Sequence, residues 1–474
     1  MSRKFQVKAI PSVWLEENGR RLDCGPYMSG AIEARQLLKK HNTESLESLT
    51  SGHNGGIYNG PQFVRNYVDD PAYGVPFLTT STMLQADMSN LPMISSKDAH
   101  STKLSYLEVE EGMTLVTCSG SIGRMAYARK DMAGCWSNQD IMKVVADSNN
   151  IKSGYLYAYL SSRFGVPIVI SGTYGAIIQH IEPHHIADLP VPRLGAVEDQ
   201  AHDLIQRAAD LRVEAAAQIQ EATSRYLVAA GLENISSYEW LQQSGRIGFT
   251  ATVSKTILRA VNYIPLNQKL SEMVKSKSPA WKPLLEVTLP GTLRRGLRFK
   301  RIDADEEFGV RLVGQREGFN LVPEGRRIAK AYLPNDPLIY VPEGTIAVAS
   351  QGGINETDSF ARAQFISGKR LEYVYSEHFL RIIGDESIIL RGALYAYIRS
   401  NLAFRLLRSC AVGSMQQDFH SDLLAEIPVP IIDEHEAISI DDSVRDAYQK
   451  YDEAIDCEDE ARTLVERVIE EGGR

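Results

Sequence analysis

Two short segments look like catalytic or phosphate-binding loops, and each lacks a residue that the chemistry needs. Asp70-Pro71-Ala72-Tyr73 lacks the second proline of the D-P-P-Y loop of amino-methyltransferases, and no F-x-G-x-G loop accompanies it. Ser367-Gly368-Lys369-Arg370 lacks the earlier glycine of a G-x-x-x-x-G-K-[ST] phosphate-binding loop. We expect turns at both places, the first leading into a strand over residues 74–78, and no catalytic residue.

Histidine and cysteine residues do not predict a metal centre. His184 and His185 follow Pro183, but no carboxylate-histidine motif with helical ligand spacing accompanies them, so we expect them in a loop before the next strand. The cysteines are odd in number, widely scattered and never spaced as a C-x-x-C pair: Cys24, Cys118, Cys135, Cys410 and Cys457. Neither a structural zinc site nor a disulfide framework is indicated.

One segment has the side chains that reading a nucleic acid requires. Lysine and arginine neutralise phosphates, and arginine also hydrogen-bonds guanine. Five such residues lie within eight positions, after the turn residues Pro290-Gly291-Thr292: Arg294, Arg295, Arg298, Lys300 and Arg301. The segment predicts a DNA contact, although a solvated charged strand accounts for the same residues.

Polar side chains at other turns are candidates for the same role. The segment from Ser51 to Gly60 is polar and glycine-rich, and its candidates are Ser51, His53, Asn54 and Tyr58. Amide groups suit adenine, and hydroxyl and guanidinium groups also reach base edges. The further candidates are Ser119, Ser121, Arg124, Tyr174, Gln351, Asn355, Gln416 and Gln417. Each of them can equally be an ordinary turn residue.

The chain repeats itself once, and the repeat relates these candidates to one another. Tyr157-Ala158-Tyr159-Leu160 recurs as Tyr395-Ala396-Tyr397-Ile398, and Leu189-Pro190-Val191-Pro192 recurs as Ile427-Pro428-Val429-Pro430, both 238 residues later. Weaker matches keep the order, the first of them pairing residues 46–49 with residues 285–288. Because the polar loops align but do not repeat, the copies are expected to share a framework and differ in surface chemistry.

Each copy is expected to be an α/β globule that ends in a long helix. Apolar runs such as residues 114–117 and 346–349 predict strands, the Y-A-Y segments predict helices, and the proline-bounded segments predict further strands. Apolar residues then recur at steps of three and four, first at Leu204, Ala208, Leu211, Ala215, Ala222 and Tyr226, and later at Ala437, Ile440, Val444, Ala447, Tyr451, Ala454, Ala461, Val465 and Val468. Only Glu458 breaks the second stripe. We expect helices of about 45 to 50 Å that pair with each other; the alternative is that each lies on its own globule.

Length and charge bound the class of protein. A chain of 474 residues is too long for one hydrophobic core, and its composition is that of an ordinary soluble protein. The N-terminus lacks the apolar core of a signal peptide and no apolar run could span a bilayer, so we expect a cytoplasmic protein. The net charge of -9 arises in residues 433–474, so the rest of the chain is nearly neutral. We expect the chain alone to bind DNA weakly.

Taken in order, the motifs resemble those of the specificity subunit of type I restriction-modification systems. The set comprises the strand Gly74-Val75-Pro76-Phe77-Leu78, the turn from Gly112 to Arg124, the Y-A-Y segment, a G-T-Y-G segment, the L-P-V-P strand and a helix that opens with Glu198-Asp199-Gln200. The resemblance covers essentially the whole chain. The second copy departs from it, because Gly309-Val310-Arg311-Leu312-Val313 replaces the proline-containing strand and Asp433-Glu434-His435-Glu436 replaces the helix start.

The resemblance implies a fold and a role. Residues 1–192 and 235–430 would be α/β target recognition domains, and residues 193–234 and 431–474 would be spacer helices, paired as an antiparallel coiled coil with pseudo-two-fold symmetry. Each domain would read one half of an asymmetric bipartite site in double-stranded DNA. The chain would bind no cofactor and catalyse no reaction. Two methyltransferase (M) subunits would carry S-adenosylmethionine, and restriction (R) subunits would supply DNA cleavage that depends on ATP and Mg.

Two other functions are compatible with the residues. The chain could be a stand-alone DNA methyltransferase or nuclease with diverged motifs, which binding of S-adenosylmethionine by the purified chain would establish. It could instead be a protein-interaction scaffold without a role on DNA, which suits the acidic isoelectric point of about 5.7. In that case no salt-sensitive binding to random duplex would be found even with a methyltransferase partner present.

Overall fold

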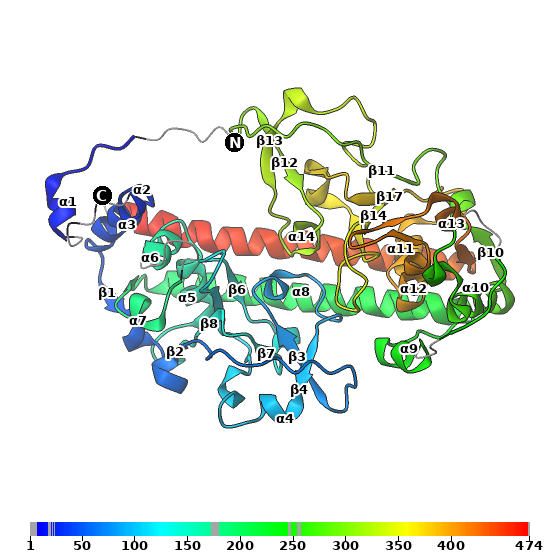
Figure 1. Ribbon diagram of the computed structural model, residues 1–474. Helices are drawn as coiled ribbons and strands as arrows, with labels where there is room; N and C mark the ends of the chain where they lie inside the picture. The colour runs from blue at the N-terminus through cyan, green and yellow to red at the C-terminus, as the bar shows by residue number, and fades with distance from the viewer. Residues whose placement is uncertain are drawn as a thin grey trace. The chain divides into compact units, whose positions relative to one another are not determined.

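The computed structural model describes residues 7–17, 20, 22, 24–171, 180–244, 248–253 and 257–472. The chain forms two compact units. Unit 1 comprises Met1–Leu84, Leu91–Val213 and Glu453–Arg474, and unit 2 comprises Gln85–Asn90 and Glu214–Asp452. Two long helices, α8 (Ala196–Ala229) and α14 (Glu434–Glu471), contribute residues to both units (Figure 1).

Unit 1 contains three small sheets. The largest is antiparallel with the strand order β2-β8-β5-β6; a second has the order β4-β3-β7, in which β3 and β7 are parallel; and β1 pairs with β9. The strands are β1 (Thr43–Ser45), β2 (Ile57–Tyr58), β3 (Gly74–Leu78), β4 (Met93–Ser95), β5 (Thr114–Thr117), β6 (Met125–Tyr127), β7 (Trp136–Ser137), β8 (Ile141–Val144) and β9 (Pro190–Pro192). The shorter helices are α1 (Ser12–Glu17), α2 (Gly25–Met28), α3 (Ala31–Leu38), α4 (Ser96–Ala99), α5 (Ser153–Leu160), α6 (Gly165–Ser171) and α7 (Pro183–Ile186).

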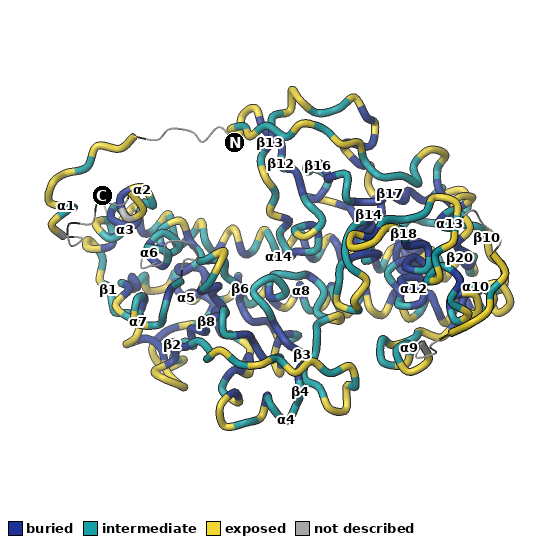
Figure 2. Tube along the Cα trace, viewed as in Figure 1, coloured by how far each residue is buried: buried dark blue, intermediate teal, exposed yellow. Residues whose placement is uncertain are grey.

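Unit 2 repeats this topology. Its sheets have the orders β11-β17-β14-β15 and β13-β12-β16, with β12 and β16 parallel; β10 pairs with β20, and a hairpin β18-β19 is added. The strands are β10 (Ala280–Pro283), β11 (Arg294–Arg295), β12 (Gly309–Val313), β13 (Arg326–Ala329), β14 (Thr345–Ala349), β15 (Ala363–Ile366), β16 (Val374–Tyr375), β17 (Phe379–Ile382), β18 (Ala411–Gly413), β19 (Gln417–Phe419) and β20 (Pro428–Ile431). The shorter helices are α9 (Ser237–Ser244), α10 (Pro265–Lys277), α11 (Arg391–Ile398), α12 (Asn401–Ser409) and α13 (Ser421–Ala425). The central strands β14 and β17 are buried throughout (Figure 2). The α/β fold and the internal repeat are therefore confirmed.

The two strongest repeated motifs are in contact with each other in each unit. The Y-A-Y segments lie in α5 and α11, and the proline-bounded segments form β9 and β20. Tyr159 donates a hydrogen bond to the carbonyl of Pro190 (2.5 Å), and Tyr397 donates to that of Pro428 (2.7 Å). The constant spacing of the motifs thus reflects one hydrogen bond between a helix and a strand, made twice.

One weaker sequence match is wrong by a single residue. Leu46–Leu49 and Leu284–Val287 form equivalent 3₁₀ helices, and each buries its first and last residue. The sequence match had placed Leu285 opposite Leu46, but the side chain of Leu285 is 54 % exposed. The two repeats therefore align by the spacing of these two buried side chains, and not by the identity of the residues.

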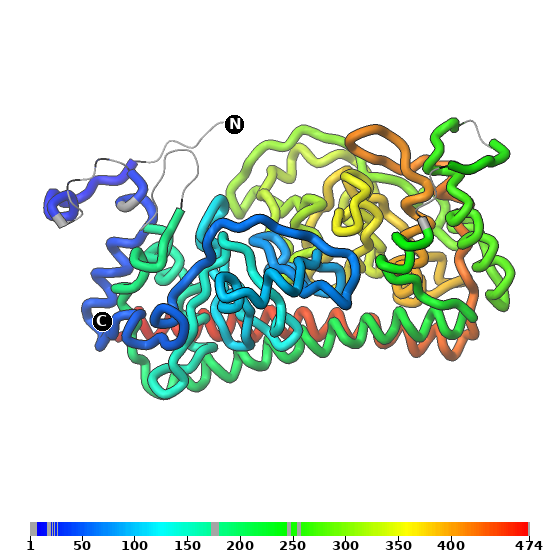
Figure 3. Tube along the Cα trace, turned by 60° about the horizontal axis from the view of Figure 1, so that its bottom comes forward, coloured from blue at the N-terminus to red at the C-terminus, as the bar shows by residue number. Residues whose placement is uncertain are grey.

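The long helices pair as the sequence predicts. Within unit 2, Arg225 lies 2.9 Å from Glu436, Gln218 donates to Asp446 at 2.8 Å, and Lys450 lies 3.5 Å from Glu214, so α8 and α14 run antiparallel. Figures 1 and 3 show the two helices side by side. The buried stripe of α14 follows the expected positions from Ile440 to Val465 but ends on Ile469, because Val468 is only half-buried.

The segments that imitate functional motifs have structural roles. Asp70 closes a turn in which the backbone N–H groups of Ala72 and Tyr73 donate to it (2.9 and 3.0 Å), and β3 follows directly, as expected. The segment after Ser367 is a 3₁₀ helix, Gly368–Glu372, and not a simple turn. His185 lies in the short helix α7, where a loop had been expected, and its Nδ1 accepts the backbone N–H of Glu182 (2.9 Å).

Candidate nucleic-acid interface

The four-stranded sheet of each unit holds a buried basic residue at the same position. β8 places Lys143 opposite Tyr58 of β2, and β17 places Arg381 opposite Arg294 of β11. Lys143 donates a hydrogen bond to Ser137 Oγ, and its Nζ lies 5.5 Å from the ring centre of Tyr58. Burial lowers the pKa of Lys143 to about 7 and raises that of Tyr58 to about 12. One framework position therefore carries different chemistry in the two units.

The buried guanidinium of Arg381 lies beneath the basic segment of unit 2. It donates to the backbone carbonyls of Tyr375 (2.7 Å), Ser376 (3.2 Å) and Phe379 (2.7 Å). Burial lowers the pKa of Arg381 to about 10. A Cβ atom on Gly296 would lie 2.6 Å from this guanidinium, so only glycine lets the basic segment cross it this closely.

Ion pairs hold three of the five basic residues predicted in this segment. Each of the three has a carboxylate partner from a distant part of unit 2, whereas the side chains of Arg298 and Lys300 are exposed. The ion pairs are Arg294 with Asp336 (2.6 Å), Arg295 with Asp418 (2.8 Å) and Arg301 with Glu377 (2.5 Å). These contacts fix the path of the segment and neutralise much of its charge.

An open surface pocket in unit 2 brings together candidates from three separate segments. Its volume is about 700 Å³. It is lined by Arg295, Gly296, Leu297, Arg298, Phe299 and Arg301 of the basic segment, by Gln351, by Glu377 and His378, and by Gln416. Five residues that the sequence singled out separately thus face one concavity, and Glu377 and His378 were missed because no sequence motif marks them.

The walls of the pocket are held by backbone contacts. Gln315 fixes Gln351 by donating to its carbonyl (2.5 Å) and accepting its N–H (3.1 Å). The predicted candidate Gln417 is buried, and its backbone N–H donates to Gly352 (2.9 Å), which joins the β18-β19 hairpin to the turn after β14. Asn355 is exposed on the same turn, outside the pocket lining.

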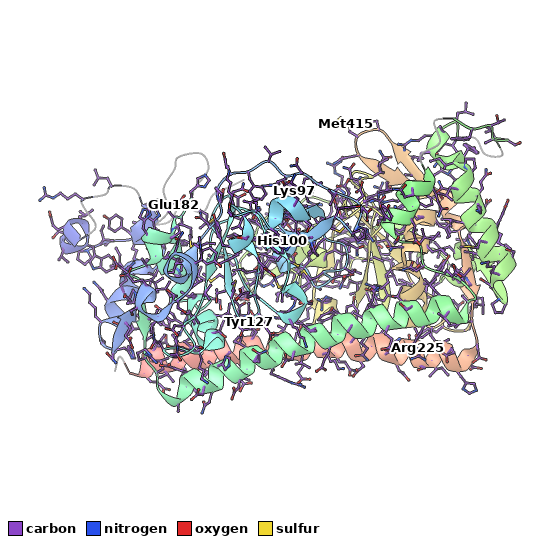
Figure 4. All side chains as sticks on the ribbon, turned by 90° about the horizontal axis from the view of Figure 1, so that it is seen from below. Lys97, His100, Tyr127, Glu182, Arg225 and Met415 are labelled. Carbon is purple, nitrogen blue, oxygen red and sulfur yellow. The ribbon has the colours of Figure 1, made fainter. Side chains whose placement is uncertain are left out.

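The tip of the β18-β19 hairpin presents an apolar side chain beside the pocket. Met415 is 92 % exposed and immediately precedes Gln416 (Figure 4). Met415 is not among the candidates predicted from the sequence, because an isolated methionine in a polar turn carries no signal in one sequence.

The corresponding surface of unit 1 is aromatic. His53 stacks on Tyr106 with ring centres 3.9 Å apart, and Tyr58 meets His53 edge-on at 5.0 Å. Ser51 and Asn54 are exposed on either side of His53, whereas Tyr58 is buried. Asn54 has a φ of 48° and Gly55 a φ of 77°, so the polar and glycine composition serves a tight turn as well as a surface.

The candidates of the Gly112 to Arg124 turn lie on a hydrogen-bonded loop. Thr117 Oγ1 donates to the carbonyl of Ser121 (2.5 Å) and accepts the backbone N–H of Arg124 (3.0 Å). Ser121 is exposed, and Ser119 and Arg124 are half-buried. Tyr174 lies outside the described residues.

Unit 1 also has a shallow concavity whose residues are not among the candidates predicted from the sequence. It has a volume of about 550 Å³ and is lined by Gln62, Phe63, Val64, Arg65 and Gln139. Arg65 donates to Gln139 Oε1 (3.2 Å). In the sequence, residues 62–65 are two apolar residues between a glutamine and an arginine, a pattern too common to mark a site.

No candidate metal centre occurs among the described residues, since no three histidine, cysteine, aspartate or glutamate side chains there are placed to share an ion. Within the same part of the chain, every helix is too short or too polar to cross a bilayer. The candidate interface therefore consists of polar, basic and aromatic side chains presented on two similar frames.

No protein-family model and no curated protein matches the sequence. Among solved structures, the chain is similar to the S subunit of a type I restriction-modification system from M. genitalium, with 12% identity and a TM-score of 0.31, over 90% of this chain and 94% of that chain. A chain from a structure on complex assembly and conformational transition of the type I R-M system matches with 11% identity and a TM-score of 0.25, over 91% and 97% of the two chains. The HsdS subunit from Thermoanaerobacter tengcongensis matches with 12% identity and a TM-score of 0.24, over 91% and 96%. These matches, each over about nine-tenths of the chain, are to the type I systems whose specificity-subunit motifs the sequence resembles.

Proposed function

We propose that this chain is the non-catalytic DNA sequence-specificity subunit of a type I restriction-modification complex. Residues 1–192 and 235–430 act as target recognition domains, and each reads one half of an asymmetric bipartite DNA site. The observation that carries the proposal is that the two units share one arrangement of strands but carry different side chains on the corresponding surface. The two units have the same strand order, but arginine, glutamine and histidine line the pocket of unit 2, whereas stacked aromatic rings form the corresponding surface of unit 1.

A duplicated frame with different surfaces suits the reading of two different half-sites. Sequence is read by side-chain groups that reach base edges, whereas the framework only has to hold them in register. In unit 2 the framework is a sheet with a buried arginine beneath the pocket, and in unit 1 it is the equivalent sheet with a buried lysine. The two equivalent sheets would therefore hold side chains that contact different bases.

Catalysis belongs to the partners in this proposal. Two methyltransferase subunits would bind S-adenosylmethionine, and restriction subunits would use ATP and Mg for cleavage in the cytoplasm. Residues 1–432 are nearly neutral, so the chain alone provides little of the phosphate neutralisation that drives DNA binding. The partners would have to supply most of the basic surface around the duplex.

Deletion of this chain from its host tests the proposal. Genome-wide mapping of methylated adenines should show one bipartite motif that is present with the chain and absent without it. Restoring the chain should restore that motif. An unchanged methylation pattern, or a methylated motif that is not bipartite, would refute the proposed function.

A further inference from the structure

The pocket of unit 2 contains arginines of two kinds. Arg295 and Arg301 are each paired with a carboxylate, Asp418 at 2.8 Å and Glu377 at 2.5 Å. An arginine engaged in this way has little remaining capacity to bind a phosphate or a base edge. These two residues tie the basic segment to β19 and to the start of β17, and so act as supports.

Two other side chains of the pocket are exposed and unengaged. Within the part of the chain that the structure describes, the side chains of Arg298 and Gln416 make no hydrogen bond or ion pair, and both line the pocket. They come from segments more than a hundred residues apart in sequence. The Arg295–Asp418 pair and the backbone hydrogen bond from Gln417 to Gly352 hold those segments together.

A third polar side chain that lines the pocket is that of His378, whose Nε2 lies 3.7 Å from Glu377. Nδ1 of His378 is buried and forms no hydrogen bond within the described residues. Because that atom is inaccessible, a ligand in the pocket would meet the rest of the imidazole, whose side chain is 38 % exposed. The pocket therefore offers a ligand the guanidinium of Arg298, the side-chain amide of Gln416 and the imidazole of His378.

The chemistry of these groups matches the major-groove edges of purines. An arginine fork bonds O6 and N7 of guanine, and a glutamine amide bonds N6 and N7 of adenine. Met415, which is 92 % exposed beside Gln416, adds an apolar surface suited to the 5-methyl group of the thymine paired with that adenine. We infer that unit 2 reads a half-site containing one G·C pair, recognised by Arg298, and one A·T pair, recognised by Gln416 and Met415. This inference rests on the proposed function.

The competing role for Arg298 is a phosphate contact, and the two roles predict different results. A phosphate contact strengthens binding to all sequences equally, whereas a base contact discriminates at one position. The test uses the chain with its methyltransferase partners in cells that carry a plasmid library with randomised sites. Methylated sites are then sequenced for the wild type and for variants R298A, Q416A and K300A.

R298A should convert one guanine position of one half-site into a position that tolerates any base. The expected loss of discrimination there is roughly ten- to a hundredfold. Q416A should do the same at one adenine position. K300A, which removes an exposed positive charge two residues away and outside the pocket lining, should lower methylation without changing the motif. The second half-site should be unaffected in all three variants.

A uniform decrease in methylation by R298A, with the motif intact, would overturn the inference in favour of a phosphate contact. Relaxation at a position that is not guanine would also overturn it. If the wild-type complex methylates without any sequence preference, the proposed function itself fails. Because Arg298 and Gln416 are exposed, the variants should keep the wild-type thermal unfolding midpoint, which separates loss of reading from loss of folding.

A second measurement isolates Met415. Replacing thymine by deoxyuridine at the adenine-containing pair removes only the 5-methyl group. The wild-type complex should bind this duplex several-fold more weakly than the thymine duplex, and M415A should bind both equally. Equal binding by the wild type would exclude Met415 from the contact.

Discussion

At the residue scale, the buried basic residues of the two sheets are held in different ways. Three backbone carbonyls within 3.2 Å accept hydrogen bonds from the two terminal NH2 groups of Arg381, whereas its buried Nε has no partner among the described residues. Lys143 has one hydroxyl partner, Ser137, and a ring face. A lysine in such a site exchanges its proton readily, whereas an arginine does not.

Replacing Lys143 by methionine should stabilise the protein at neutral pH. The pKa of the amine is about 7 in the folded chain, against an ordinary value of 10.5, because burial disfavours its charge. Between these two values the unfolded chain binds more protons, so stability rises with pH, and the lysine opposes folding most at pH 7 and below. The gain from K143M should be a few kcal/mol at pH 7 and should disappear towards pH 10.

Thermal unfolding midpoints at several pH values would measure this effect. The exposed Lys300 provides the control, since K300M should show no comparable dependence on pH. A gain from K143M that stays constant from pH 7 to pH 10 would mean that the buried amine does not titrate in this range.

At the scale of elements, the helix pair contains one buried acid in its apolar stripe. Glu458 lies 2.5 Å from Arg212 of α8, accepts a hydrogen bond from Arg462 (2.6 Å) and accepts another from the hydroxyl of Tyr157 in α5 (2.6 Å). Burial alone would raise the pKa of Glu458, but these partners outweigh it and lower the pKa to about 2. Glu458, which interrupts the apolar stripe of α14, therefore joins α14 to α8 and α5 within unit 1.

Removing this carboxylate should destabilise unit 1 strongly. E458A leaves the buried Arg212 without its counter-charge, which costs about 3–5 kcal/mol. E453A removes an exposed pair with Arg207 (3.2 Å) from the same helix, and it should cost less than about 1 kcal/mol. Urea unfolding of both variants would measure the difference, and equal costs would contradict the role assigned to Glu458.

The acid dependence of the same network has a definite sign. The pKa of Glu458 is lower in the folded chain than its ordinary value of 4.5. Its stabilising contribution is therefore complete above pH 4.5 and is lost as the pH falls towards 2. In E458Q this loss should be absent from the pH profile of the unfolding midpoint.

In each repeat, the Y-A-Y helix packs against a long helix through a glycine. The N–H of Gly154 donates to His202 Nδ1 (3.1 Å), and that of Gly392 donates to Asp441 Oδ1 (2.5 Å). A Cβ on Gly392 would lie 2.6 Å from the Asp441 carboxylate and 3.0 Å from its Cα. The glycines permit the close approach that these hydrogen bonds require.

G392A should therefore destabilise unit 2, although alanine normally favours a helix over glycine. Overpacking of this kind costs about 1–3 kcal/mol. G248A, at a position where a Cβ meets no atom within 4 Å, serves as the control and should have little effect. Wild-type stability of G392A in urea unfolding would show that α11 can move away from α14 without cost.

At the scale of the whole molecule, the proposed function makes the helix pair a spacer between two readers. α8 and α14 contain 34 and 38 residues, so they are about 51 and 57 Å long. One turn of a DNA duplex is about 34–36 Å. A spacer of this length would set two half-sites apart with unread base pairs between them.

Inserting one helical turn into both helices tests this spacer. Four residues placed after Val213 in α8 and after Asp452 in α14 would lengthen each helix by about 6 Å. The unread gap of the methylated motif should lengthen by about one or two base pairs, and both half-site sequences should persist. Insertion into α8 alone, which breaks the pairing, is the control and should abolish methylation. An unchanged gap would exclude the spacer role.

The sequence by itself determined the framework of this protein. Local apolar patterns and two motifs 238 residues apart predicted the α/β class, the internal repeat and the paired helices. These features depend on side chains close together in the chain and on the same hydrogen bond made twice, Tyr159 to Pro190 and Tyr397 to Pro428. Because the motifs that make these contacts occur twice, they can be recognised in a single sequence.

Only the tertiary structure decided which side chains could share a site. Arg298, Gln416 and His378 meet in one pocket because ion pairs and backbone contacts join three distant segments, and no spacing in the sequence encodes that. Burial separated Gln417 from Gln416, which faces solvent, and the ion pair with Asp336 separated Arg294 from the exposed Arg298. Neighbouring residues of the same type differ in what they contact, and contacts across a fold depend on the whole chain.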